Sequence, residues 1–335
     1  MGSKYLSKVQ YGMESTRGTA VPATRMWTGA ALAIPSDTKI AYPEEQFGVR
    51  AAARRAAVQQ KEFRSTLVSE HAIFQALRLL LECGLKGGVT WAEVTPAQSD
   101  YKGIYTPSLT AANAPKACTI EMGDDTQAYE VEYCQFERIH LSGSIGQGAE
   151  PSPVKLEADF FGRQVTATTF TAAQSPHTPT GINAALSRLY IDTSWASVGG
   201  TELASLMRTW DLEILTGIHP VWSGSANTYF THYNESVIGV MFGFTIEAGV
   251  VSAAKYLLQQ SQTFQAARID LVGPQIGTGT NHRLRVELGG TFEEVTQNES
   301  DDRGDNLSAF VLHGLYNDTG AKELVVECTT NVDAV

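Results

Sequence analysis

Apolar and polar residues alternate along most of this chain, and no other feature of the sequence constrains the fold as strongly. In residues 154–160, Val, Leu, Ala and Phe occupy every second position, with Lys, Glu and Asp between them. Residues 129–133, 206–214, 238–247 and 283–288 follow the same rule. Successive side chains of a β-strand point to opposite faces of the sheet. The pattern therefore predicts antiparallel sheets with one apolar face and one solvated face.

Two segments depart from this alternation and are predicted to be helices. Residues 70–83 carry an apolar stripe at helical spacing. Ser69 is the expected N-cap of this helix, and Gly84 is expected at its C-terminal end in the left-handed conformation. A second, shorter helix is predicted at residues 253–260, with Ser252 as its cap. The helix at residues 70–83 is expected to face a core.

The order of these elements repeats along the chain. In each half a strand precedes the helix, and a further strand, a turn and a long alternating run follow it. The runs end in Phe160-Phe161-Gly162 and in Leu312-His313-Gly314. The spacing is 42 residues from Ile120 to Gly162 and 43 from Leu271 to Gly314. A repeat of this kind predicts two similar structural units.

The predicted fold is therefore mainly β. It consists of two tandem antiparallel β-sandwich or barrel-like domains, each with one α-helix, preceded by an extended N-terminal arm and loop. The domains are expected at residues 63–163 and 189–335, with a linker rich in Pro, Ser and Thr at 164–188.

Residues 1–62 show no clear period and are predicted to form an arm and a docking loop. Residues 49–60 are rich in Ala and Arg, which favours a short helix there. The apolar residues of the arm are expected to contact a neighbouring subunit, so deleting residues 1–30 is expected to block assembly without unfolding the domains. These candidate inter-subunit residues are Tyr11, Met13, Met26, Trp27 and Ile34.

Charge and composition exclude several classes of protein. The chain has 25 Lys and Arg against 36 Asp and Glu, a net charge of −11, whereas nucleic-acid binding relies on clustered positive charge. No run of 18 apolar residues is present, so neither a transmembrane helix nor a membrane partner is expected. The four cysteines lack a metal-binding spacing and are expected to be reduced thiols. No metal and no cofactor are predicted.

The chain is not expected to be an enzyme, because none of its candidate catalytic residues has the spacing that a known catalytic motif requires. Ser142-Gly143-Ser144-Ile145-Gly146 misses the nucleophile elbow Gly-x-Ser-x-Gly. Gly277 and Gly279 lack the third glycine of a nucleotide-binding loop. Pairs such as Glu130 with Glu157 would suit glycoside hydrolysis only across a cleft, and solvated strand carboxylates are much commoner.

Several short motifs, in their order along the chain, resemble the tail-tube (major tail) proteins of long-tailed bacteriophages. Residues 11–24 read YGMESTRGTAVPAT, and that family often has Gly-x-Glu-(Ser/Thr)-x-x-Gly-Thr-Ala near its start. The later motifs are Gly103-Ile104-Tyr105-Thr106-Pro107, Glu121-Met122-Gly123-Asp124, Phe160-Phe161-Gly162-Arg163 and Leu189-Tyr190-Ile191-Asp192.

This resemblance implies a structural virion protein. Subunits with two tandem domains form trimeric rings of pseudo-sixfold symmetry, which stack into a hollow tube around a tape-measure protein. Expected partners are other copies of the chain, the tape-measure and tail-end proteins, and double-stranded DNA in transit. The expected location is the phage tail, assembled in the host cytoplasm. Another virion component (a tail terminator, decoration or baseplate-type protein) and a β-sandwich carbohydrate-binding protein remain as alternatives.

Carboxylates on the polar strand faces suit such a conduit. If these faces line a lumen, they repel phosphate on close approach, while the field is screened within a Debye length of about 8 Å. Lysines at these positions would instead hold the duplex. The alternative is an ordinary solvated outer face. The candidate lumen residues are Glu130, Glu132, Glu157 and Asp159.

Overall fold

A computed structural model of the chain confirms the mainly β prediction. Strands account for 51% of the chain and helices for 9%, and the large sheets are antiparallel. The structure describes residues 4–31, 34–146, 151–203, 206–300 and 304–332.

The first half of the chain forms a set of antiparallel strands around one helix, α1. Its strands β6, β11, β10 and β9 lie side by side in that order, and β1 pairs with the outer edge of β9. The main elements are β1 (Lys8–Met13), β6 (Phe63–Ser69), α1 (Phe74–Leu80), β9 (Cys118–Gly123), β10 (Ala128–Ser144), β11 (Val154–Gly162) and β12 (Val165–Thr168).

The second half repeats this order of pairing around the second helix, α2. Strands β17, β20, β19 and β18 follow one another, and β13 pairs with β18 as β1 pairs with β9. Strand β21 pairs with β19, as β12 pairs with β10. The elements are β13 (Ser187–Asp192), β14 (Met207–Leu215), β17 (Gly239–Glu247), α2 (Val250–Gln260), β18 (Gln265–Ile276), β19 (Thr280–Ser300), β20 (Asn306–Gly314) and β21 (Leu324–Thr330).

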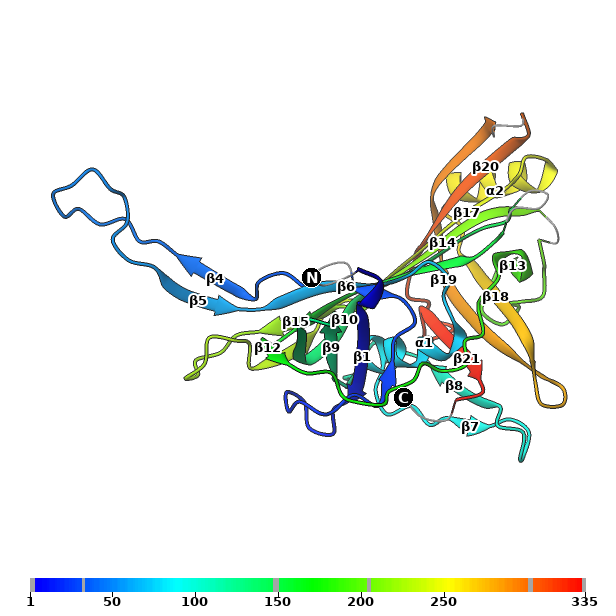
Figure 1. Cartoon of the computed structure of the whole chain (residues 1–335). Coiled ribbons are helices and arrows are strands. Elements are labelled where there is room, and N and C mark those ends of the chain that lie inside the picture. Colours follow the sequence, from blue (N-terminus) through cyan, green and yellow to red (C-terminus); the bar gives the residue numbers. More distant parts are fainter. Residues whose placement is uncertain (1–3, 32–33, 147–150, 204–205, 301–303, 333–335) are drawn as a thin grey trace.

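One continuous sheet joins the halves. Strand β14 hydrogen-bonds to β17 on one side and to β10 on the other, which gives the antiparallel order β6–β11–β10–β14–β17–β20–β19 (Figure 1). A β-bulge falls at the same place in both halves, after Phe136 in β10 and after Phe292 in β19. The buried residues of both halves also form one continuous core cluster.

Residues 86–117, between the helical turn η2 (Leu81–Leu85) and β9, cross to the second half. The short strands β7 (Ala92–Glu93) and β8 (Tyr101–Tyr105) pair with each other, and β8 adds to the edge of β21. Strand β12 lies within residues 164–188, the range expected to be a linker. Parts of both segments therefore belong to the sheets.

The N-terminal residues lie largely within the first half of the fold. Strand β1 pairs with β9 over six residues, and β2 (Arg25–Met26) and β3 (Ala30–Ala31) pair with β1 and β6. Tyr11 and Trp27 are only 2% and 4% exposed. The prediction that these two side chains contact a neighbouring subunit is therefore wrong, because they pack inside their own chain.

Residues 38–61 form a hairpin that projects far from the body of the protein (Figure 1). Strands β4 (Thr38–Ala41) and β5 (Ala57–Lys61) pair with each other in a separate two-stranded sheet. The helix predicted at residues 49–60 is absent from this described segment. The Ala and Arg propensity is weak, and strand pairing overrides it.

Both helices have starts that differ from the prediction. Ser69 ends β6, and α1 begins at Phe74 with Ile73 as its N-cap. The helix continues as a π-helical turn, η2 (Leu81–Leu85), which includes Gly84, so Gly84 does not terminate it in the left-handed conformation.

The second helix, α2, begins three residues earlier than predicted. Gly249 is its N-cap, and the Ser252 hydroxyl accepts a hydrogen bond from the Gly249 N–H at 2.9 Å. Ser252 therefore stabilises the first turn from the third helical position instead of capping the helix.

A bulge in β10 interrupts the alternation of residues 129–133. The pairing with β9 shifts between Val131 and Cys134, and Tyr133 has a φ of 57°. Tyr133 consequently leaves the main core and joins a second apolar cluster, where its ring lies 5.1 Å from that of Phe230. The predicted common face for Tyr129, Val131 and Tyr133 is wrong for this reason.

His282 contributes to the contact between the halves, and we expect it to make stability depend on pH. Its ring stacks on Phe74 of α1 at 5.4 Å, and burial lowers its pKa to about 4. The imidazole of His282 therefore takes up a proton more readily in the unfolded chain than in the folded one. This residue has no effect on the free energy of unfolding above pH 6.5, and it lowers that free energy as the pH falls towards 4. Thermal melts of His282→Gln should show a weaker dependence over this range. His219→Gln, at an exposed position, is the control and should behave like the wild type.

Candidate functional site: the polar sheet face and the free edge of β19

The outward face of the continuous sheet is polar over its central strands. Cross-strand neighbours form two rows, each crossing β11, β10 and β14. The first row is Glu157, His140 and Glu213, and the second is Lys155, Ser142 and Asp211. The apolar residues between them, such as Leu156, Leu141 and Leu212, point to the core. The period-two pattern thus places this polar surface on one side of the sheet.

Arg138 organises the charges of this face. Its guanidinium lies 3.3 Å from the Asp159 carboxylate and 3.7 Å from that of Glu157, and it also hydrogen-bonds to Glu213. Asp211 adds a fourth carboxylate and Lys155 adds a second cation, whereas Arg138 and Asp159 lie opposite each other in the row next to Glu157 and His140. Four carboxylates against two cations leave the face acidic, although it is less acidic than the predicted residues alone imply.

The four predicted acidic residues do not lie together. Glu157 and Asp159 belong to the polar face, whereas Glu130 and Glu132 lie in the earlier part of β10, which pairs with β9 and β12. Burial raises the pKa of Glu130 and of Glu132, and Arg163 lies 3.6 Å from Glu132. The single acidic surface that was predicted is therefore divided into two sites.

The remaining candidate arm residues differ in exposure. Met13 and Met26 are partly buried, at the end of β1 and in β2. The Sδ atom of Met13 lies 3.7 Å from the Sγ atom of Cys83. Ile34 follows β3 and is 38% exposed. Among these residues, Ile34 is the one most available for contact with another molecule.

Part of β19 has a free edge. In β10, residues 138–144 pair with β11 on one side and with β14 on the other. The corresponding part of β19, residues 294–300, pairs with β20 on one side. Strands β18 and β21 pair only with earlier residues of β19, so its other side has no strand partner among the described residues. An open edge of this kind is a template for another strand.

The opening sequence motif has a structural role that the sequence did not reveal. The buried Glu14 carboxylate accepts hydrogen bonds from the backbone N–H of Gly18 at 2.6 Å and of Tyr133 at 2.7 Å, and from the Thr119 hydroxyl at 3.0 Å. Gly18 has a φ of +73°, which favours glycine. Glu14 and Gly18 thus fix the turn after β1 against β9 and β10.

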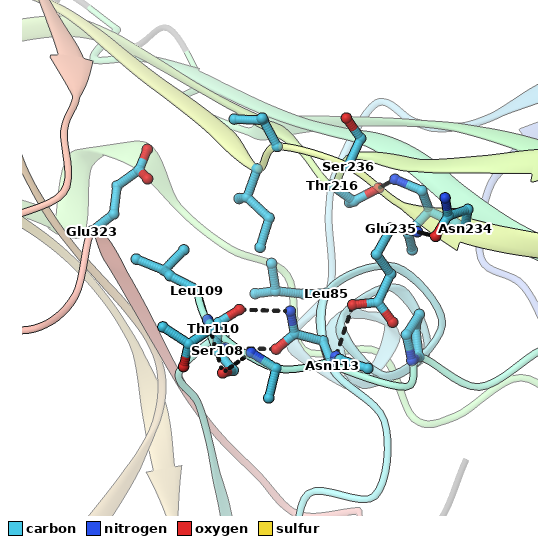
Figure 2. Close-up of a pocket in the computed structure, with 16 residues that line it drawn as sticks. Leu85, Ser108, Leu109, Thr110, Asn113, Thr216, Asn234, Glu235, Ser236 and Glu323 are labelled. Carbon is cyan, nitrogen blue, oxygen red and sulfur yellow. Dashed lines mark hydrogen bonds between the residues drawn. The ribbon is translucent and has the colours of Figure 1, made fainter.

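An open pocket of about 590 Å³ lies where residues 108–115 meet the second half (Figure 2). Its polar groups mostly hold the protein together. The Glu235 carboxylate accepts from the N–H groups of Asn113 at 2.7 Å and Ala114 at 3.0 Å. Asn113 in turn bonds both backbone groups of Ser108. Glu323 has no such hydrogen bond among the described residues, and burial raises its pKa. No histidine, cysteine or basic side chain is among the lining residues that the structure describes.

The sequence was compared with protein families and with curated proteins. No protein family matches the sequence, and no curated protein matches it. Within the described residues, no group of three or more His, Cys, Asp or Glu is arranged to hold a metal ion. The helices of the described segments are too short or too polar to cross a membrane.

Proposed function

We propose that this chain is the structural subunit of a phage tail tube, which assembles into rings that stack around a lumen for DNA. The observation that carries this proposal is the repeated strand order. The edge of β10 that pairs with β14 inside the chain corresponds to an edge of β19 that has no strand partner among the described residues. The resemblance of the opening motif and of the later motifs supports the same class of protein.

The internal junction supports the proposal of a ring. Strand β14 bridges β17 and β10, and in the first half β3 occupies the corresponding place beside β6. We infer that the β3 segment of a second copy adds to β19 at residues 294–300, as β14 adds to β10. Each such contact is head to tail, and head-to-tail contacts whose rotation closes generate a ring. A trimer of two-domain chains then has pseudo-sixfold symmetry. Ile34, just after β3, belongs to the proposed contact between β3 of one copy and β19 of the next.

The polar face is the proposed wall of the lumen. Strands β11, β10 and β14 present Glu157, Asp211 and Glu213 on the side of the sheet opposite the core. Ion pairing with Arg138 reduces the field but leaves an excess of carboxylates. Such a wall repels phosphate at short range and releases no condensed counterions, so a duplex passes without being held. The tape-measure protein is the proposed occupant before DNA passes.

The β4–β5 hairpin is the proposed contact between stacked rings. It carries the exposed apolar residues Ile40, Tyr42, Val49 and Val58, which are 48–66% exposed. Isolated two-stranded hairpins are marginally stable in water. A second ring that covers the hairpin would supply the burial it lacks within one chain.

Negative-stain microscopy of the purified chain, with sedimentation analysis, tests this function. We expect rings and hollow filaments with a regular axial repeat, and no catalytic turnover is needed for their formation. A single monomeric species at every protein and salt concentration would contradict the proposal.

A further inference from the structure

Helix α2 presents an uncharged face to solvent. Val250 is 90% exposed and Leu257 is 63% exposed, and Ala253 and Ala254 lie between them on the same side. The one charged residue of the helix, Lys255, is partly buried. An exposed helix normally carries charges on its outer face. A contiguous apolar surface of this kind marks an interaction site.

Helix α1 occupies the corresponding place in the first half and shows how such a face is covered. It lies between β6 and β9 in the chain, as α2 lies between β17 and β18. Except for the partly buried Arg78, all of its residues are buried. Figure 1 shows α1 close to β21, whereas α2 lies on the outside of the molecule.

The cover of α1 comes from the second half of the chain. Helix α1 contacts β19 and β21. The ring of Phe74 stacks on that of His282 at 5.4 Å, and the Gln75 amide donates to Asn331 Oδ1 at 3.0 Å. The first helix therefore packs between its own half and strands β19 and β21 of the second half.

Strand β12 of the first half is the counterpart of β21. Each pairs with the long central strand of its half: Val165 lies opposite Val131 in the first half, and Val326 lies opposite Val286 in the second. The sequence of β12 is VTAT, without charge, and Thr166 and Ala167 are exposed. A small, uncharged strand surface of this kind suits an uncharged helix face.

We propose that the outer face of α2 docks on β12 of a second copy of this chain, as α1 docks on β21 within one copy. This inference rests on the proposed function and names a contact within the ring that it requires. It places the helix contact beside the proposed addition of β3 to the free edge of β19. The strand and the helix then bridge the same pair of subunits.

Substitution of Leu257 tests the docking surface. The side chain is 63% exposed, so Leu257→Asp should fold with the thermal stability of the wild type. We expect it to remain monomeric at concentrations at which the wild type assembles, with at least a tenfold higher concentration needed for rings. Val94→Asp is the matched control and should assemble normally, because Val94 is 46% exposed and follows β7, which lies far from α2 in Figure 1. Wild-type assembly by Leu257→Asp would overturn the inference.

Disulfide trapping tests the partner surface. The four native cysteines are buried, so Leu257→Cys combined with Ala167→Cys introduces the accessible thiols of the described structure. Oxidation by added copper phenanthroline and dissolved oxygen should form an S–S bond between them, with two electrons passing to the oxidant and two thiol protons released to solvent. We expect a covalent trimer as the largest product, because the contacts close around one ring. Each single substitution should yield monomer on a non-reducing gel.

The outcomes separate this inference from the tube itself. Tubes that form normally but give no cross-linked product overturn the docking of α2 on β12 and leave the tube proposal intact. Covalent closed trimers that never stack into tubes support the docking and contradict the tube. An unlimited ladder of covalent products overturns the docking within a ring, because it places the contact between rings.

Discussion

A chain that lacks residues 1–30 is expected to lose its cooperative fold. The deletion removes β1 and β2, and with them Tyr11 and Trp27, which are 2% and 4% exposed. Truncating one buried Trp or Phe alone typically costs about 3–5 kcal/mol. Whole domains are stable by only about 5–15 kcal/mol. Loss of β1 also leaves the backbone groups along one edge of β9 without partners, which lowers the free energy of unfolding further. Circular dichroism melts and near-ultraviolet spectra provide the measurement.

A shorter deletion is the control for this result. Removal of residues 1–7 spares β1, and Tyr5 and Leu6 are 96% and 54% exposed. We expect this variant to keep a wild-type melting temperature. A cooperative transition near the wild-type temperature for the longer deletion would contradict the account. It would instead restore the prediction from sequence that this segment acts only between subunits.

Shortening the β4–β5 hairpin is expected to stop tube growth without unfolding the body. Replacement of residues 42–56 by Asn-Gly joins Ala41 to Ala57, which are paired in the hairpin, through a two-residue turn. The apolar side chains at the tip are exposed, so the melting temperature should change by only a few degrees. Electron microscopy should show rings, with long tubes absent or greatly reduced in number.

A second variant replaces residues 42–56 by a Gly and Ser loop of the same length. It tests whether tube growth needs the side chains of the hairpin tip or only the length of the hairpin. We expect it to be as defective as the short turn, because the contacts proposed for Tyr42 and Val49 are lost in both variants. Tubes of normal length from either variant would show that the hairpin is not the contact between rings.

The sequence predicted the strands well because their pattern is local. Alternation over residues 154–160 and 206–214 depends only on a core on one side of each strand, and these segments lie in or overlap β11 and β14. The matched Gly162 and Gly314 endings likewise lie at the ends of β11 and β20.

Predictions from local propensity were wrong where contacts between distant parts of the chain decide the structure. Residues 49–60 favour a helix by composition but belong to a projecting hairpin. Ser69 suits an N-cap, yet it ends β6, where its hydroxyl donates to Thr28 O at 3.1 Å. The bulge that turns Tyr133 away from the core also has no local signal, because it depends on the register with β9.

The features of the candidate site could not be predicted from the sequence, because they also depend on contacts between distant residues. The pairing of β10 with β14 and of β8 with β21 joins residues that are far apart in the chain. The free edge of β19 is defined only by comparison with β10, and the exposure of α2 only by comparison with α1. Arg138 was missed because its three carboxylate partners come from two other strands.

A cryo-EM reconstruction of tubes assembled from the purified chain tests the central claim most directly. The account predicts rings of three subunits, with the polar face of β11, β10 and β14 turned to the axis and β19 of each copy paired with the β3 segment of the next. Glu157 and Asp211 should then line the lumen. A map in which this face lies on the outer surface, or in which β19 remains unpaired, would contradict it.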